Sequence, residues 1–185
     1  MTRVGTMLGL AAALALAAGG SVRAQTAAPE YAVKATFLYK FAPFVTWPLA
    51  DLDGAASPLL VCVVGEDPFG AFLDQAVAGQ KVDQHPITIR RMKAADRTSG
   101  CHILYLGGSP TQSVAQGLAA LRGAHVLTVT DAANGGERGV VHFVVEANRV
   151  RFHVDDQAAA QNGLAISSKL LSLALSVRPR APERR

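Results

Sequence analysis

Hydrophobic positions near the start of the chain follow a helical spacing. From Pro29 to Trp47, apolar residues recur at steps of three and four, and three phenylalanines widen the apolar stripe. This pattern predicts a helix over residues 29–47 that is buried on more than one side. Pro43 should kink the helix or end its regular part, and Trp47-Pro48 should stop it, because a residue before proline avoids the helical region.

Short apolar runs follow, separated by segments with helical spacing or turn residues. A polar loop is expected over residues 51–57. Ser109 and Pro110 suit the N-cap and first position of the helix that follows them. The pattern predicts strands over residues 59–64, 86–92, 101–106 and 125–130, and helices over residues 68–78 and 111–121.

Two alternating runs near the C-terminus predict a β-hairpin. Its strands are Gly139–Val145 and Arg149–Val154, and Asn148 can take the left-handed turn position. Two short helices should follow, the first capped by Asp155 or Asp156 and ending near Asn162-Gly163, the second capped by Ser167 or Ser168. The whole pattern predicts a single α/β domain: a central mixed, mostly parallel sheet with a C-terminal antiparallel hairpin and helices on both faces.

The basic charge is concentrated at the two ends of the chain. The 185 residues include 18 Lys and Arg against 14 Asp and Glu, a net charge of +4. Arg3, Arg23 and the four arginines after residue 177, set against Glu183, account for the excess, so residues 25–177 hold 12 basic and 13 acidic residues. A basic stripe of the kind that binds nucleic acid is missing. We expect residues 178–185 to be a flexible, solvated tail.

The first 24 residues have the pattern of a cleaved secretory signal peptide. Arg3 precedes an apolar run over residues 7–18, and Val22-Arg23-Ala24 ends in small residues at the −3 and −1 positions. The run is shorter than the roughly 20 residues of a membrane-spanning helix. We therefore expect cleavage near Ala24, export, and a mature domain over residues 25–177.

Export changes the meaning of the two cysteines, Cys62 and Cys101. In an oxidising compartment they can form a disulfide, which would close a loop of about 40 residues and contribute roughly 4 kcal/mol in the chain-entropy model. The alternative is two buried free thiols on neighbouring strands. No Cys-x-x-Cys motif indicates thioredoxin-like chemistry.

No arrangement of residues predicts a catalytic, cofactor or metal site. The Gly65–Gly70 segment follows a strand but lacks the spacing of a phosphate loop, and its acidic residues would repel an anion. Ser167-Ser168-Lys169 is better explained as a helix cap than as a Ser-Lys pair. His142 and His153 lie on the two hairpin strands and are expected to face each other as polar surface residues. None of the five histidines shows metal-ligand spacing: His85, His102, His125, His142 and His153.

The glycine-rich segment from Asp131 to Gly139 is the best candidate for a functional loop. It follows the fourth predicted strand, at the sheet edge where α/β folds place their binding crevice. Turn chemistry ahead of the hairpin explains the same residues equally well.

Four blocks, in order, resemble the YfiR family of exported bacterial proteins, and the resemblance extends over essentially the whole mature chain. The blocks are EYAVKATFLYKFAPFVTWP at 30–48, CVVGEDPFG at 62–70, CHILYL at 101–106 and GLAISSKLLSLA at 163–174.

The resemblance implies a periplasmic repressor without enzymatic activity or cofactor. The best-understood family members bind the periplasmic part of an inner-membrane diguanylate cyclase, YfiN, and hold it inactive, while an outer-membrane lipoprotein, YfiB, sequesters the repressor. The resemblance also implies a homodimer and a disulfide at Cys62 and Cys101. A second family disulfide is missing, because no later cysteine exists.

We therefore expect a periplasmic regulator that represses a membrane diguanylate cyclase and so lowers cyclic-di-GMP synthesis. The first alternative is a small-ligand-binding accessory protein of a membrane sensor such as a histidine kinase. The second is a hydrolase or redox enzyme, for which the sequence offers no set of residues. Partner-binding residues are not identified by the sequence.

Overall fold

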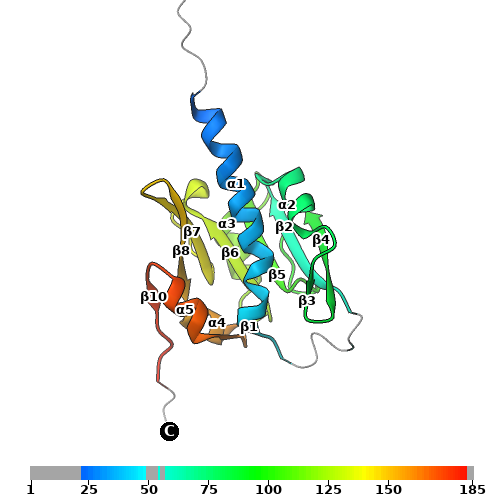
Figure 1. Ribbon diagram of the computed structural model, residues 1–185. Helices are drawn as coiled ribbons and strands as arrows, with labels where there is room; N and C mark the ends of the chain where they lie inside the picture. The colour runs from blue at the N-terminus through cyan, green and yellow to red at the C-terminus, as the bar shows by residue number, and fades with distance from the viewer. Residues whose placement is uncertain (1–21, 49–53, 55–56, 183–185) are drawn as a thin grey trace, which may run out of the picture.

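A computed structural model describes residues 22–48, 54 and 57–182, with the side chains of the first helix described from Pro29 on (Figure 1). The helices are α1 (Val22–Lys40), α2 (Ala71–Val77), α3 (Val114–Ala120), α4 (Asp156–Gln161) and α5 (Ser168–Leu173), with 3-10 turns η1 (Ala42–Phe44) and η3 (Ala132–Asn134). The strands are β1 (Val45–Thr46), β2 (Leu59–Gly65), β3 (Lys81–Val82), β4 (His85–Met92), β5 (Ile103–Gly108), β6 (Leu127–Asp131), β7 (Val141–Glu146), β8 (Arg149–Asp155), β9 (Ala165–Ile166) and β10 (Val177–Arg178).

The predicted mixed sheet is confirmed. Its eight strands run in the order β10-β8-β7-β6-β5-β2-β4-β3, and β1 pairs with β9 in a separate two-stranded sheet. The neighbours from β4 to β7 are parallel, whereas β7 and β8 form the predicted antiparallel hairpin. From β2 the chain passes to β4, which lies on one side of β2, and then to β5, which lies on the other side of β2. The carboxyl ends of β2 and β5 therefore meet at a topological switch point.

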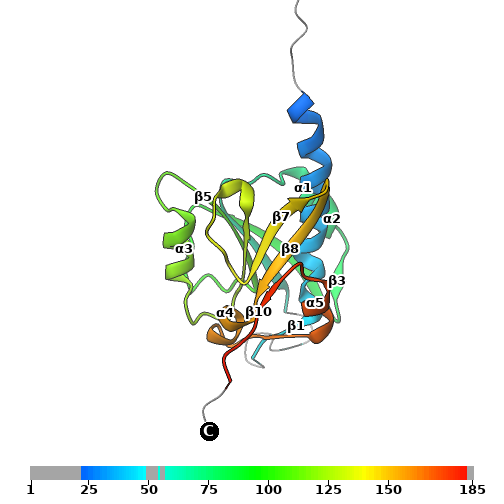
Figure 2. The same cartoon turned by 90° about the vertical axis from the view of Figure 1, so that its left-hand side faces the viewer.

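Helices cover both faces of the sheet and enclose two hydrophobic cores. Figure 2 shows α1 and α2 on one side of the sheet and α3 on the other. The larger core lies under α1 and α2, and the smaller one lies under α3. A disulfide joins Cys62 in β2 to Cys101 just before β5, inside the smaller core. The strands between these layers are almost continuously apolar because both of their faces are buried.

The regular part of the first helix ends just before Pro43, which is one of the two outcomes predicted for this proline, and it begins at Val22 rather than at Pro29. Regular helix stops at Lys40, and the 3-10 turn η1 contains Pro43. Proline has no N–H to donate, and its ring clashes with the carbonyl one turn earlier. The residues beyond it, Val45 and Thr46, pair instead with β9. The apolar spacing continued past Lys40 because these residues remain buried in the same core.

Two further expectations about local structure are corrected or refined. Ser109 does not cap α3: it accepts from the N–H of Gln112 in a preceding turn, while Ser113 and Gln116 form a capping box. The helix therefore starts at Val114, three residues later than the start at residue 111 that the sequence pattern predicted. In the hairpin, Asn148 is left-handed as predicted, and Ala147 is too, with φ of 60° and 47°. Such a pair is what a two-residue turn between twisted strands requires.

The start of the basic tail is not free, contrary to expectation. Arg178 lies in β10, parallel to β8, and its Nη1 is 3.2 Å from Asp155. Arg180 makes two hydrogen bonds to the carboxylate of Asp156 at 2.8 and 2.9 Å. These partners sit around the start of α4, where negative side chains favour the helix dipole. Residues 1–21 of the predicted signal peptide, and most of the predicted loop over 51–57, lie outside the described residues.

Candidate functional site

A lysine in the middle of α1 is fully buried and bridges two carboxylates. The Nζ atom of Lys34 lies 2.5 Å from Oε1 of Glu30 and 2.5 Å from Oδ2 of Asp131. The side chains of Lys34 and Asp131 are each 1% exposed, and that of Glu30 is 27% exposed. Burial lowers the pKa of Lys34, but its two hydrogen bonds outweigh burial and leave the pKa raised. The lysine therefore stays charged and ties α1 to the end of β6.

Aromatic rings enclose this ion network. The Nζ atom of Lys34 lies 4.9 Å from the ring centre of Tyr31 and 6.0 Å from that of Phe143, within the range of cation–π attraction. Phe69 packs edge-on against both Tyr31 and Tyr105, at 5.9 and 4.7 Å between ring centres. Burial, reinforced by the charge of Asp131, raises the pKa of both tyrosines. Both therefore remain neutral and serve as packing and hydrogen-bonding groups.

The predicted functional loop begins inside this network. Asp131 bonds Lys34 through one oxygen and accepts from the N–H of Ala133 through the other. Asn134 donates to the hydroxyl of Tyr105 at 2.9 Å. The beginning of the loop is thus held rigidly, and its residues from Ala132 to Arg138 are exposed. Sequence reasoning missed Lys34, although a signal existed: this lysine falls on the apolar stripe, three residues after Tyr31 and four before Leu38.

A groove runs between α1 and the tip of the β7–β8 hairpin, and we call it the α1–hairpin groove. Its volume is about 660 Å³. A second hollow of about 430 Å³ continues it along α1 and shares Val33 and Phe37 with it. Val33 is 45% exposed and Val145 is 48% exposed, so apolar side chains stand open on both walls. The groove is lined by Pro29, Glu30, Val33, Phe37, Val145, Asn148, Arg149 and Val150.

The floor of the groove is anchored in the main core. The ring of Phe37 packs against Phe41 and Phe152, each 5.9 Å away between centres, and against Phe143 at 6.2 Å. Side chains packed this tightly lose little further freedom when a partner covers them. An open apolar surface on a preformed, rigid floor is a feature of protein-binding sites.

A crevice of about 500 Å³ lies at the switch point of the sheet. Residues after β2, β5 and β6 line it, among them Glu66, Ser109 and Asn134. The strand ends approach so closely that a Cβ on Gly107 would lie 2.0 Å from the carbonyl oxygen of Glu66. The nearby segment from Gly65 to Gly70 is structural, because Asp67 accepts from the N–H groups of Phe69 and Gly70. This position is the usual ligand site of open α/β sheets.

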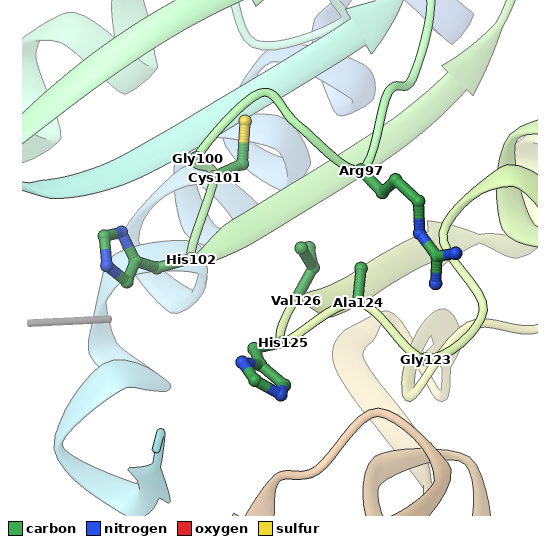
Figure 3. A pocket seen from close by; sticks show the side chains of 8 residues that line it. All are labelled: Arg97, Gly100, Cys101, His102, Gly123, Ala124, His125 and Val126. Carbon is green, nitrogen blue, oxygen red and sulfur yellow. The ribbon is translucent and has the colours of Figure 1, made fainter. Parts of the chain in front are cut away.

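A third hollow, of about 510 Å³, lies beside the disulfide at the amino ends of β5 and β6 (Figure 3). His102 and His125 come from the segments that enter these strands, and Arg97 reaches across from the other side. His102 accepts from the N–H of Leu60 through Nδ1, and Arg97 donates to the carbonyl of Arg122. These bonds hold chain segments together, and Cys101 has no thiol to act as a nucleophile.

The remaining candidates occupy structural positions. Ser167 caps α5 by accepting from the N–H of Leu170, and Lys169 lies 5.6 Å from the ring centre of Phe44. This leaves no Ser-Lys arrangement at that point. His142 and His153 do face each other across the hairpin, with ring centres 6.4 Å apart, but His142 is 3% exposed and therefore not the surface residue that was predicted. Within the described residues, no three His, Cys, Asp or Glu side chains gather closely enough to hold a metal ion.

Fold and surface together define the class: an α/β domain that carries an open apolar groove between its first helix and its hairpin. The model of a family described as YfiR/HmsC-like matches residues 31–175, and the chain belongs to this family. The family is regulatory and non-catalytic, acts in the periplasm, and works with a membrane signalling partner. No match to a curated protein was found. None of the described helices is long and apolar enough to cross a membrane.

Proposed function

We propose that this protein is exported to the periplasm and represses an inner-membrane diguanylate cyclase of the YfiN type by binding its periplasmic part. The observation that carries the proposal is the α1–hairpin groove in a chain of the YfiR/HmsC-like family. Repression lowers cyclic-di-GMP synthesis. The protein itself supplies binding and no catalysis.

The occupant of the groove is then an apolar segment of the cyclase's periplasmic part. Val33 and Val145 provide the apolar walls, while Glu30 and Arg149 offer one charge of each sign at the rim. Apolar contacts give affinity, and a polar rim with both charges selects orientation. Repression needs differential binding: shifting the cyclase from almost fully active to almost fully inactive requires about 10⁴-fold tighter binding to the inactive state.

Three further parts of the proposal come from the family. The signal peptide is cleaved near Ala24, so that the mature chain starts at Gln25. The mature protein forms a homodimer. A YfiB-like outer-membrane lipoprotein competes for the protein and releases the cyclase by lowering the free repressor concentration. N-terminal mass determination of the periplasmic protein and sedimentation of the purified protein test the first two.

The groove is tested by two single variants, Val33→Glu and Val145→Glu, and a control, Leu173→Glu. Leu173 is 54% exposed on α5 and does not line the groove, so its change adds the same charge elsewhere. The tagged proteins are produced with their own signal peptide, and cross-linked membrane partners are identified by mass spectrometry. We expect the control to retain a membrane cyclase and to keep cyclic-di-GMP low. Both groove variants should lose capture and raise cyclic-di-GMP.

Full capture and repression by both groove variants would contradict the assignment of the groove. Capture of no membrane protein at all would contradict the repressor function. Thermal melting and the intact disulfide, measured on each variant, show whether a lost interaction is due to misfolding.

A second function, as a small-ligand-binding accessory protein of a membrane sensor such as a histidine kinase, is favoured by the switch-point crevice. In that case the captured protein is a kinase. A ligand that enters the crevice raises the melting temperature of the isolated protein, and Ser109→Trp, which fills the crevice, abolishes that rise.

A further inference from the structure

A pocket on the opposite face of the hairpin gathers two histidines and two arginines. The aromatic residues Phe143 and Phe152 of β7 and β8 point toward α1. Side chains alternate along a strand, so His142 and His153 lie on the other face of the sheet. The pocket has a volume of about 250 Å³. Figure 2 shows its three strands, β7, β8 and β10, side by side at the near edge of the sheet.

Each histidine is oriented by a hydroxyl group that occupies one ring nitrogen. Nδ1 of His142 is 2.8 Å from Oγ1 of Thr130, and Nδ1 of His153 is 2.7 Å from Oγ of Ser176. The Nε2 atoms make no hydrogen bond to the part of the chain that the structure describes. Both side chains line the pocket, so these two nitrogens are the ring atoms left for a ligand. His142 is buried at 3% exposure, which fixes its ring in place.

Two arginines give the pocket a positive potential. Arg138, from the loop before β7, has no ion pair with any described residue. Arg178 forms an ion pair with Asp155, in which its Nη1 lies 3.2 Å from Oδ2. The other oxygen of Asp155 caps α4 by accepting from the N–H of Ala158, so this carboxylate is already committed on both sides. The one acidic lining group is therefore engaged, and the charge of Arg138 is uncompensated.

The histidines respond to this environment. Burial first, and the charge of Arg138 second, lower the pKa of both His142 and His153. The charge of Asp131 raises the pKa of His142, and the charge of Glu146 raises that of His153. Lys34, on the other face of the sheet, lowers the pKa of His142 further. An anion between the rings would raise both pKa values again, because a negative charge favours the protonated form of each ring.

We propose that this pocket binds the oxyanion group of a small ligand, a phosphate or a carboxylate, between Arg138 and the Nε2 atoms of His142 and His153. Binding is coupled to proton uptake by the histidines and is tighter at acidic pH. Charge-assisted hydrogen bonds from a guanidinium and two imidazolium groups recognise such an anion. A volume of about 250 Å³ accommodates an anion of a few heavy atoms with some of its water. The pocket is independent of the α1–hairpin groove on the other face.

The test is a phosphate titration of the full mature protein, followed by NMR of the histidine ring protons. It is run at about pH 5.5 and about pH 8, on either side of the ordinary histidine pKa, at constant ionic strength with chloride as the competing anion. We expect the resonances of His142 and His153 to shift and their pKa values to rise with phosphate. Affinity for sulfate, an oxyanion that keeps its double charge at both pH values, should be about tenfold higher at the lower pH.

Variants separate the pocket from general attraction to a basic surface. Arg138→Gln should weaken phosphate binding about tenfold, and His153→Gln should remove much of the pH dependence. The matched control is Arg151→Gln. Arg151 lies on β8, the strand that carries His153, opposite Val144, and it does not line the pocket. This control should change affinity by less than about twofold, because this half-buried charge lies outside the pocket and salt screens its effect on the bound anion. Equal losses in Arg138→Gln and Arg151→Gln would overturn the proposal.

A second arm distinguishes the sources of the anion. Vesicles of phosphatidylglycerol are compared with vesicles of phosphatidylcholine in a flotation assay. Flotation with the anionic vesicles alone, lost in Arg138→Gln, assigns the pocket to a lipid headgroup. Phosphate binding without flotation assigns it to a soluble ligand. No shift of either histidine with phosphate and no flotation would refute the site.

Discussion

The buried ion network predicts that replacing Lys34 by methionine strongly destabilises the fold. Methionine keeps the length and apolar stem of the side chain but removes the charge. Asp131, 1% exposed, is then left as a buried carboxylate without its cation. Removing one partner of a buried pair typically costs about 3–5 kcal/mol. Glu30 adds little to this loss because it is 27% exposed and solvent can reach it.

The assay is equilibrium unfolding in urea, followed by the fluorescence of the single tryptophan, Trp47, which is buried in the main core. Domains of this size unfold with about 5–15 kcal/mol, so Lys34→Met should remain folded but with a much lower midpoint. The control is Lys40→Met, on the exposed face at the end of the same helix, which should change stability by less than about 1 kcal/mol.

A double variant identifies the cause. Lys34→Met combined with Asp131→Asn removes both charges and keeps an oxygen that can accept from the N–H of Ala133. It should recover most of the stability lost in Lys34→Met, because a neutral pair no longer leaves a buried charge. A Lys34→Met protein within about 1 kcal/mol of the wild type would refute the reasoning. A double variant no more stable than Lys34→Met would refute the attribution to Asp131.

The remaining predictions concern the disulfide and the hairpin histidines. Thiol titration of the denatured, unreduced protein should find no free thiol, and Cys62→Ser with Cys101→Ser should lower stability by about 4 kcal/mol; two titratable thiols would contradict the bond. Because burial lowers the pKa of His142 and His153, the unfolded chain takes up more protons, and in chloride buffer the urea midpoint should fall as the pH drops below about 6.5. His153→Gln should fall less over the same range, and an equal fall in both proteins would count against the histidines.

Local patterns in the sequence predicted most of the elements, because their causes lie within a few residues. The continuous apolar run of β2 and the turn at Asn148 are of this kind, as is the cap of α5 by Ser167. Pro43 was correctly predicted as a possible end of the regular helix, which stops at Lys40. The error came where two local signals competed: Ser109-Pro110 outweighed the capping box that begins at Ser113.

The pairs that make up the candidate sites were harder to predict because their partners are far apart in the chain. Lys34 meets Asp131 across 97 positions, and β10 returns to β8 so that Arg178 reaches Asp155. Each of these residues was visible in the sequence as a charge near an apolar segment. Which charge met which depended on strand order, and strand order follows from the packing of the whole sheet.

By itself, the sequence determined the class of fold and the family, because hydrophobic periodicity and four short motifs in a fixed order can be recognised without knowledge of distant contacts. Only the tertiary structure decided where surfaces form. The α1–hairpin groove combines Val33 with Val145, and the anion pocket combines Arg138 with His153; both depend on how the hairpin lies against its neighbours. The physical reason is that burial and local electrostatics are properties of an assembled environment, to which segments distant in the chain contribute jointly.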